Sequence, residues 1–208
     1  MQENDIIATL ETADQAPDSP LILFRQWFAL AEGSEPVDPN AMALATVDQS
    51  GKSSVRMVLM KAFDERGFVF FTNMQSRKGE SLIANPNAAL CFHWKSLARS
   101  IRIEGTFSPV SKDESDAYYN TRARGSRLSA WASQQSRPLA SRTTLTDAVD
   151  AMDRKYEGTD NIPRPAHWAG CRIAPERIEF WHDGKFRVHT RLLYTKQGST
   201  WGKQLLFP

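Results

Sequence analysis

The 208-residue sequence lacks most of the features that mark metal centres, membrane proteins and secreted proteins. It has two cysteines, Cys91 and Cys171, without a C-x-x-C pair or a histidine at the spacing of metal ligands. No apolar run reaches the roughly 18 residues that a membrane-spanning helix needs. The N-terminus is acidic and polar, unlike a signal peptide. These absences predict a cytoplasmic protein with no metal site and no membrane partner.

The sequence is also short of net charge and of phosphate-binding motifs. Its 26 Lys and Arg nearly balance 24 Asp and Glu, which leaves a net charge of +2 and predicts no nucleic-acid partner. The motifs G-x-G-x-x-G, G-x-x-x-x-G-K-[ST] and G-x-S-x-G are absent, which argues against a Rossmann site, a P-loop and a hydrolase nucleophile. Any chemistry would therefore come from a cofactor held by local clusters of basic side chains.

Short apolar segments separated by turn residues predict a mainly β protein. We expect an arm at residues 1–18 that is mobile, followed by one domain at 19–208 of class α+β, with an antiparallel barrel or sandwich and flanking helices. Strands are expected at 42–48, 54–61, 68–72, 88–94, 100–107 and from 171 onward, and helices at 19–30, 77–84, 111–119 and 141–156.

Two of the basic clusters lie in the first half of the chain. Arg56 and Lys61 stand near the two ends of an expected strand, where their odd spacing places them on opposite faces. Arg77 and Lys78 begin an expected helix, where cations oppose the helix dipole unless an anion binds there. We interpret the second pair as a phosphate site, with a solvated basic pair as the alternative.

Two further clusters lie in the second half. Tyr118 and Arg122 are four residues apart, so one helix face would present both a hydroxyl and a guanidinium. Arg187, His189 and Arg191 alternate in a segment, 179–191, that reads as a strand. Three such groups on one face would repel one another unless something anionic or electron-rich lay against them. The alternatives are an ordinary surface pair in the first case and an exposed polar strand in the second.

Together these segments resemble the pyridoxamine 5′-phosphate oxidase family over residues 20–208. The resemblance implies an FMN-binding split β-barrel, Greek-key-like, that works as a homodimer with flavin sites at its interface. The implied reaction oxidises pyridoxamine or pyridoxine 5′-phosphate to pyridoxal 5′-phosphate by hydride transfer from substrate C4′ to flavin N5, while O₂ is reduced to H₂O₂. The motifs that carry it are Arg56-Met-Val-Leu-Met-Lys61, Phe71-Thr-Asn-Met-Gln-Ser-Arg-Lys78, Tyr118-x-x-x-Arg122-x-x-x-Ser126, Trp131-Ala-Ser-Gln-Gln-Ser136 and Glu179-Phe-Trp-x-x-Gly-x-x-Arg-Val-His-x-Arg191.

The resemblance also implies a role for each matching residue. Arg187 and His189 would be the catalytic pair that covers the substrate ring, because a planar guanidinium can lie on its face. Lys61, Tyr118, Arg122 and Ser126 would hold the substrate phosphate. One subunit would line FMN with Arg56, Met57, Val58, Leu59, Met60, Lys61, Phe71, Thr72, Arg77 and Lys78, while the other would add Gln135, Ser136, Trp181 and Arg191.

Some positions depart from the family's usual residues. Thr190 stands where Asp is common, so we expect Arg187 or Arg191 to be held less firmly. Ser100 stands at a flavin-contacting position that is usually Gln, and a hydroxyl would reach the flavin only through water or not at all. Phe71 replaces Tyr, Leu205 replaces Arg, and the usual Arg-Arg-x-Tyr lid of the N-terminal arm is missing.

These departures keep two alternatives open. One is a related split-barrel flavoprotein that acts on another substrate, such as an aromatic secondary metabolite. The other is a carrier of flavin or pyridoxal phosphate that does not turn over. Retention of Lys61, Tyr118, Arg122 and Ser126 favours the oxidase, because those groups would otherwise have no phosphate to hold.

Overall fold

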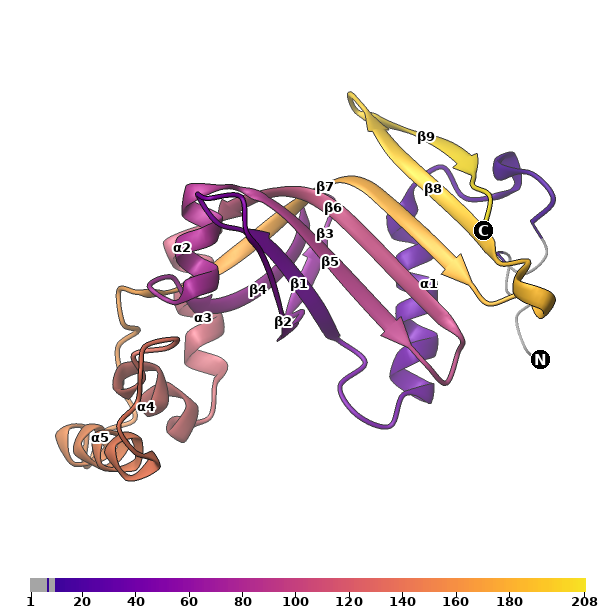
Figure 1. Ribbon diagram of the computed structural model, residues 1–208. Helices are drawn as coiled ribbons and strands as arrows, with labels where there is room; N and C mark the ends of the chain where they lie inside the picture. Colours follow the sequence, from indigo (N-terminus) through magenta and orange to yellow (C-terminus); the bar gives the residue numbers. More distant parts are fainter. Residues whose placement is uncertain (1–6, 8–9) are drawn as a thin grey trace.

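One curled antiparallel sheet carries the fold (Figure 1). The computed structural model describes residue 7 and residues 10–208. Its strands follow the order β2-β1-β5-β6-β7-β4-β3, and β8 and β9 extend from β7. The strands are β1 Ala41–Val47, β2 Ser53–Leu59, β3 Ala62–Asp64, β4 Gly67–Asn73, β5 Asn87–Trp94, β6 Arg99–Pro109, β7 Trp168–His182, β8 Thr190–Gln197 and β9 Thr200–Leu205. The helices are α1 Pro20–Ser34, α2 Arg77–Ala84, α3 Lys112–Thr121, α4 Arg124–Ala132 and α5 Arg142–Lys155.

The mainly β, antiparallel α+β class is confirmed, since every strand pairing is antiparallel. The expected strand 54–61 ends earlier, at Leu59, because the Met60 N–H bonds the Asn40 carbonyl and the Lys61 N–H bonds the Val69 carbonyl. None of the helices in the described part of the chain has both the length and the apolar composition needed to cross a membrane.

The prediction of one continuous strand over residues 179–191 is wrong. Strand β7 ends at His182, and Lys185–Arg187 form a 3-10 turn in which Phe186 and Arg187 have φ of 58° and 65°. Gly184 permits this tight connection, since a Cβ there would lie 1.8 Å from the Val188 carbonyl oxygen. The alternating face assumed for Arg187, His189 and Arg191 therefore does not exist.

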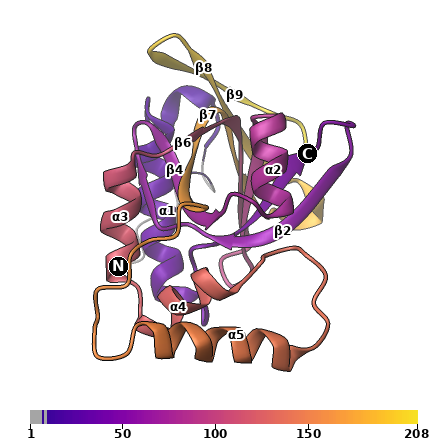
Figure 2. The same cartoon turned by 90° about the vertical axis from the view of Figure 1, so that its left-hand side faces the viewer.

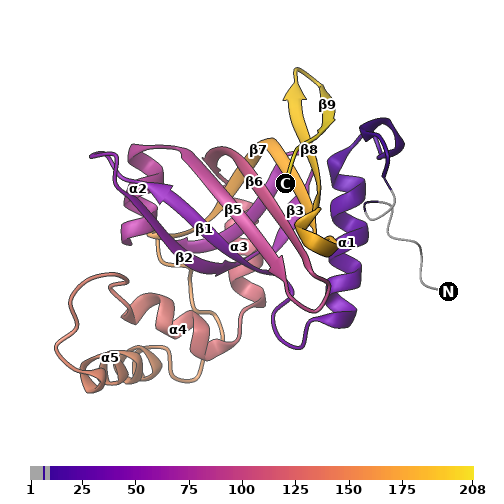
Figure 3. The same cartoon turned by 45° about the vertical axis from the view of Figure 1, so that its right-hand side comes forward.

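Helix α1 covers the inner face of the sheet (Figure 3). Its start is set by Ser19, whose hydroxyl accepts from the Leu21 N–H, and by Pro20 in the first turn. Phe24 and Trp27 are almost fully buried, and their rings meet Phe68, Phe92 and Phe180 edge-on. This aromatic core holds the sheet's curvature and leaves its opposite face free to carry polar side chains.

Part of the expected mobile arm, residues 1–18, packs against the domain. Ile7 and Ala16 are buried in the core, and the Tyr194 hydroxyl donates to the Pro17 carbonyl at 2.7 Å. Residues 1–6, 8 and 9 of the arm lie outside the described part of the chain. Its mobility stays a prediction.

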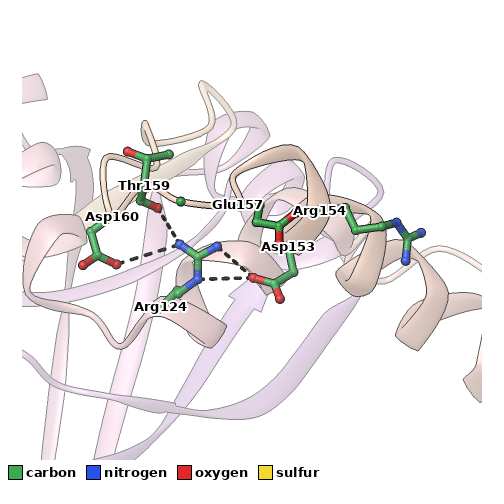
Figure 4. Close-up of a pocket in the computed structure, with 7 residues that line it drawn as sticks. Arg124, Asp153, Arg154, Glu157, Thr159 and Asp160 are labelled. Atoms are coloured by element: carbon green, nitrogen blue, oxygen red, sulfur yellow. Dashed lines mark hydrogen bonds and ion pairs between the residues drawn. The ribbon is translucent and has the colours of Figure 1, made fainter.

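Helices α3, α4 and α5 lie at one end of the molecule, away from the β8–β9 hairpin (Figures 1 and 2). Arg124 of α4 ties this end together, because it donates to Asp153 of α5 at 2.8 Å and to the Thr159 carbonyl at 2.6 Å (Figure 4). The hollow of about 440 Å³ beside it is lined by Arg124, Arg154 and three carboxylates. Arg124 is occupied by these internal bonds, so we assign this hollow a structural role.

Candidate functional site

A basic pocket of about 260 Å³ opens between β2, β4, α2 and α3. Three cations face it, and its lining contains no carboxylate. Ten of its eleven residues were predicted from the sequence, and the eleventh is Trp168. We call this space the basic pocket. It is lined by Met57, Val58, Leu59, Lys61, Phe71, Thr72, Lys78, Tyr118, Arg122, Gln135 and Trp168.

Arg56 lies on β2 next to the pocket-lining Met57, and the hydrogen bonds that the structure describes for its side chain go to neutral acceptors. Its guanidinium donates to the Leu44 carbonyl at 3.0 Å, the Thr46 hydroxyl at 2.9 Å and the Ser54 hydroxyl. Burial, and then the nearby charge of Arg77, lower the pKa of Arg56. The positive charge here is fixed in place without a compensating carboxylate.

The turn from β4 into α2 brings Lys78 to the pocket. The Ser76 hydroxyl caps α2. Only glycine fits at position 79, because a Cβ there would lie 2.3 Å from the Met74 carbonyl oxygen. Lys78 Nζ lies 2.8 Å from Gln135 Oε1 and 3.3 Å from the Thr72 hydroxyl. Burial, and then repulsion by Arg56, lower the pKa of Lys78, so the ammonium is poised for an anion.

Gln135 does not lie where the resemblance puts it. It was expected from the other subunit, yet it bonds Lys78 within the same chain. The reason is that the segment after α4 folds back over α2: Asn73 Nδ2 reaches the Ser133 carbonyl at 3.5 Å, and Arg137 bonds Glu80. Gln135 therefore belongs to the basic pocket.

An aromatic stack forms the opposite wall of the pocket. The Phe71 ring lies 4.1 Å from that of Tyr118 and 5.2 Å from that of Trp168, with interplanar angles of 17° and 10°. The Arg122 guanidinium lies 4.8 Å from the Trp168 ring, and its buried Nη1 has no hydrogen-bond partner in the described residues. Burial lowers the pKa of Arg122. An unpaired buried donor of this kind is costly unless a ligand satisfies it.

A second group of predicted residues lies on the exposed face of β6–β8. Ser100, Trp181 and Arg191 are direct neighbours in register across three strands. Arg191 is held by two bonds to Glu179, at 2.8 and 3.1 Å, and by the Phe207 carbonyl at 2.9 Å. Of the two arginines that were expected to be held less firmly, Arg191 is held firmly, because Glu179 supplies the charge that Thr190 lacks. For Arg187 the expectation stays a prediction.

The two predicted catalytic residues follow in the connection to β8. Arg187 is exposed, and His189 lies with its ring 4.8 Å from that of Trp181. His189 Nδ1 is 2.9 Å from Asp183 Oδ1 and 3.2 Å from the Gly184 nitrogen. Nδ1 can make only one of these two hydrogen bonds at a time. Without a proton it accepts from the Gly184 N–H, and with a proton it donates to the Asp183 carboxylate. We call Ser100, Trp181, Arg187, His189 and Arg191 the strand-end cluster.

The basic pocket and the strand-end cluster lie toward opposite ends of β7, because Trp168 belongs to the first and Trp181 to the second. Figure 1 shows this strand running along the sheet from the side of α3 toward β8. Trp168 begins this strand and His182 ends it. Fourteen steps at about 3.3 Å each span roughly 45 Å of chain. One small ligand cannot reach both ends within a single chain.

A few predicted residues lie outside both groups. Met60 is 4% exposed and packs in the core, although it was expected to line the flavin. Arg77 begins α2, while Ser126 on α4 and Ser136 beyond it are exposed. Trp168 was missed; its only sequence signal is an aromatic residue just after the Pro-rich stretch at 162–165.

A curled antiparallel sheet with a basic pocket beside it defines the split-barrel class. A solved structure of PhzG from Burkholderia lata, in complex with tetrahydrophenazine-1-carboxylic acid, is 31% identical, covers 94% of this chain and 95% of its own, and has a TM-score of 0.87. An FMN-binding protein related to pyridoxamine 5′-phosphate oxidase, from Nostoc punctiforme, shares the fold at a TM-score of 0.73 and 16% identity, covering 93% of this chain and all of its own.

Sequence comparison gives the family. The model described as pyridoxamine 5′-phosphate oxidase matches residues 32–156, and the one described as pyridoxine 5′-phosphate oxidase C-terminal dimerisation region matches 168–208. Curated relatives named pyridoxine/pyridoxamine 5′-phosphate oxidase are 51% identical in Granulibacter bethesdensis, over 99% of both chains, and 55% identical in Gluconobacter oxydans, over 91% of this chain and 94% of that one. The chain belongs to the pyridoxamine 5′-phosphate oxidase family.

Proposed function

We propose that this protein is an FMN-dependent oxidase that converts pyridoxine or pyridoxamine 5′-phosphate to pyridoxal 5′-phosphate, with O₂ as the electron acceptor. One observation carries the proposal. The basic pocket presents Lys61, Lys78 and Arg122 and no Asp or Glu, so it suits an anion with several oxygens. Substrate and FMN both carry a phosphate.

The donor set fits these phosphates. Arg122 Nη1 is buried without a hydrogen-bond partner among residue 7 and residues 10–208, and a phosphate oxygen would satisfy it. Lys78 has a lowered pKa because it is buried and lies near Arg56, and a bound anion would relieve both causes. Neutral acceptors alone surround Arg56, so its charge also remains available to the site.

The work left to the chain is chiefly positioning. Bound FMN supplies the hydride acceptor and passes the electrons to O₂. Lys61, Tyr118 and Arg122 would hold the substrate phosphate, and Arg187 and His189 would cover the ring. Holding two reactants in one orientation supplies a large part of the rate enhancement, which agrees with the lack of a carboxylate base in the pocket.

A homodimer would unite the two halves of the site. The basic pocket of one subunit would meet the strand-end cluster of the other, because the two lie too far apart within one chain. The outer edge of the sheet supports such contact, since Val55, Met57 and Leu59 are 69%, 64% and 36% exposed along β2. Residues 168–208 match a family region described as a dimerisation region.

PhzG supports a second candidate, an oxidase for another aromatic substrate. The structure of that protein holds a phenazine carboxylic acid, and it is 31% identical to this chain. Lys61, Tyr118 and Arg122, gathered in one pocket, favour a phosphorylated substrate instead.

An anaerobic experiment separates these candidates. Protein loaded with FMN is mixed with pyridoxine 5′-phosphate without oxygen, and the yellow flavin absorbance is followed. We expect bleaching that returns when air is admitted, together with formation of pyridoxal 5′-phosphate. A flavin that binds and stays yellow with both the alcohol and the amine would contradict the proposed function, and bleaching by tetrahydrophenazine-1-carboxylic acid alone would support the second candidate.

A further inference from the structure

Trp168 has ring contacts with both other aromatic residues of the pocket wall, Phe71 and Tyr118, and with Tyr119 behind them. Its ring lies 5.2 Å from Phe71, 6.2 Å from Tyr118 and 5.2 Å from Tyr119. Its indole face carries the Arg122 guanidinium at 4.8 Å. Trp168 is 6% exposed, so this contact is largely shielded from water.

Arg122 needs such a support because no helix holds it. It follows the last residue of α3 and precedes the N-cap residue of α4, with φ of −75° and ψ of 145°. A free arginine side chain samples many rotamers, and fixing it in one of them costs conformational entropy. The ring faces of Trp168 and Tyr119 restrict Arg122, while its Nη1 remains free of partners in the described residues.

Trp168 is itself fixed by the backbone and by its neighbours. It pairs in register with Asn73 of β4, and its backbone N–H donates to the Pro165 carbonyl at 3.0 Å. Arg164 donates to the Trp168 carbonyl and is held in turn by Asp116 of α3. This network joins the start of β7 to the helix that carries Tyr118.

We infer that Trp168 is a positioning residue for the substrate's phosphate: its indole face holds Arg122 so that Nη1 points at the anion. The inference rests on the proposed function for the identity of the substrate. Cation–π stacking on a shielded indole is the strongest form of this contact, and a planar guanidinium exploits it better than an ammonium. In this inference Trp168 acts on the bound phosphate through Arg122.

The test compares Trp168→Leu with Trp168→Phe in the FMN-loaded protein. Inorganic phosphate is titrated calorimetrically, and KM and kcat for pyridoxine 5′-phosphate are measured separately. For Trp168→Leu we expect a phosphate Kd and a KM raised about tenfold, with kcat within about twofold. Trp168→Phe keeps an aromatic face and should restore both values to within about threefold.

Two further variants make the test decisive. In an Arg122→Met background, Trp168→Leu should add no further loss, because the guanidinium that it positions is gone. Trp201→Leu, a partly buried tryptophan on β9, should leave Kd and KM unchanged. If Trp168→Leu does not fold, Trp168→Met, whose flexible side chain can fill part of the space without a ring, takes its place.

Equal phosphate Kd in wild type and Trp168→Leu would overturn the inference. So would equal losses in the Leu and Phe variants, or a full tenfold loss in the Arg122→Met background. If wild type binds phosphate but oxidises no pyridoxine 5′-phosphate, the proposed function fails while the phosphate titration still decides the role of Trp168.

Discussion

At the scale of the residue, basic side chains of this chain fall into two kinds that the sequence does not distinguish. Arg191 and Arg172 are neutralised by carboxylates, the latter at 2.7 Å from Asp64 Oδ1. Lys78 and Arg122 line the basic pocket, where no carboxylate faces them. The first kind holds the fold together, and the second kind is available for a ligand.

The alkaline pH dependence of FMN binding should report Lys78. Burial and Arg56 lower its pKa from 10.5, so rising pH removes its proton earlier than it would from a free lysine. Since the charged form holds the anion, FMN affinity should fall as pH rises toward about 10. Lys78→Arg stays charged there and should bind with a flatter profile. Calorimetric titration of both proteins checks this, and identical profiles would show that another group titrates.

At the scale of the element, polar contacts on the exposed face of the sheet lock three strands together. The Glu179 carboxylate of β7 forms ion pairs with Arg102 of β6 and with Arg191 of β8. Its side chain is 10% exposed. Burial alone would raise the pKa of Glu179, but the hydrogen bonds from Arg191 and Arg102 lower it below the ordinary 4.5. The charged form of Glu179 therefore stabilises the fold.

Glu179→Gln should lower the free energy of unfolding by about 1–3 kcal/mol at neutral pH. Because the folded pKa of Glu179 is depressed, its stabilising contribution is present above pH 4.5 and is lost as pH falls through the lower, folded value. The difference between the two proteins should therefore shrink at about pH 3. Urea unfolding at both pH values measures it.

Glu104→Gln is the matched control. Glu104 forms an exposed pair with Arg177 at 3.4 Å, in the same sheet. Its loss should change stability by less than about 0.5 kcal/mol. An equal loss in the two variants would mean that burial of the Glu179 group contributes nothing.

At the scale of the whole molecule, the length of β7 decides how the site is assembled. The strand carries Trp168 at one end and Trp181 near the other. The first belongs to the basic pocket and the second to the strand-end cluster. Under the proposed function, a complete site would therefore take two copies of the chain, each presenting a different end.

Mixed dimers test this assembly. Arg122→Met disables the basic pocket, and Arg187→Met disables the strand-end cluster, so the homodimer of each variant should be nearly inactive. After unfolding and refolding of an equal mixture, half of the dimers are mixed, and each of these has one intact site. We expect recovery of about a quarter of the wild-type activity. No recovery would show that both halves come from the same chain.

The sequence was sufficient to predict most of the basic pocket. Side-chain alternation and turn residues located β1, β4, β5 and β6, and the cation pair at the start of α2 indicated an anion. These signals are local, because they depend on spacing within one element. The segment at 179–191 misled the same reasoning, since alternation of Arg187, His189 and Arg191 does not reveal the close approach of Gly184 to Val188.

By itself the sequence determined the strand class, the helix caps and the basic residue types that would suit a phosphate, because caps, periods and charges act over a few residues. Only the tertiary structure decided which cations stay unpaired, that Gln135 joins Lys78, and that Trp168 supports Arg122. The physical reason is that pairing and burial depend on contacts between residues far apart in the chain. Glu179 meets Arg102 across 77 positions, and no local pattern encodes such a distance.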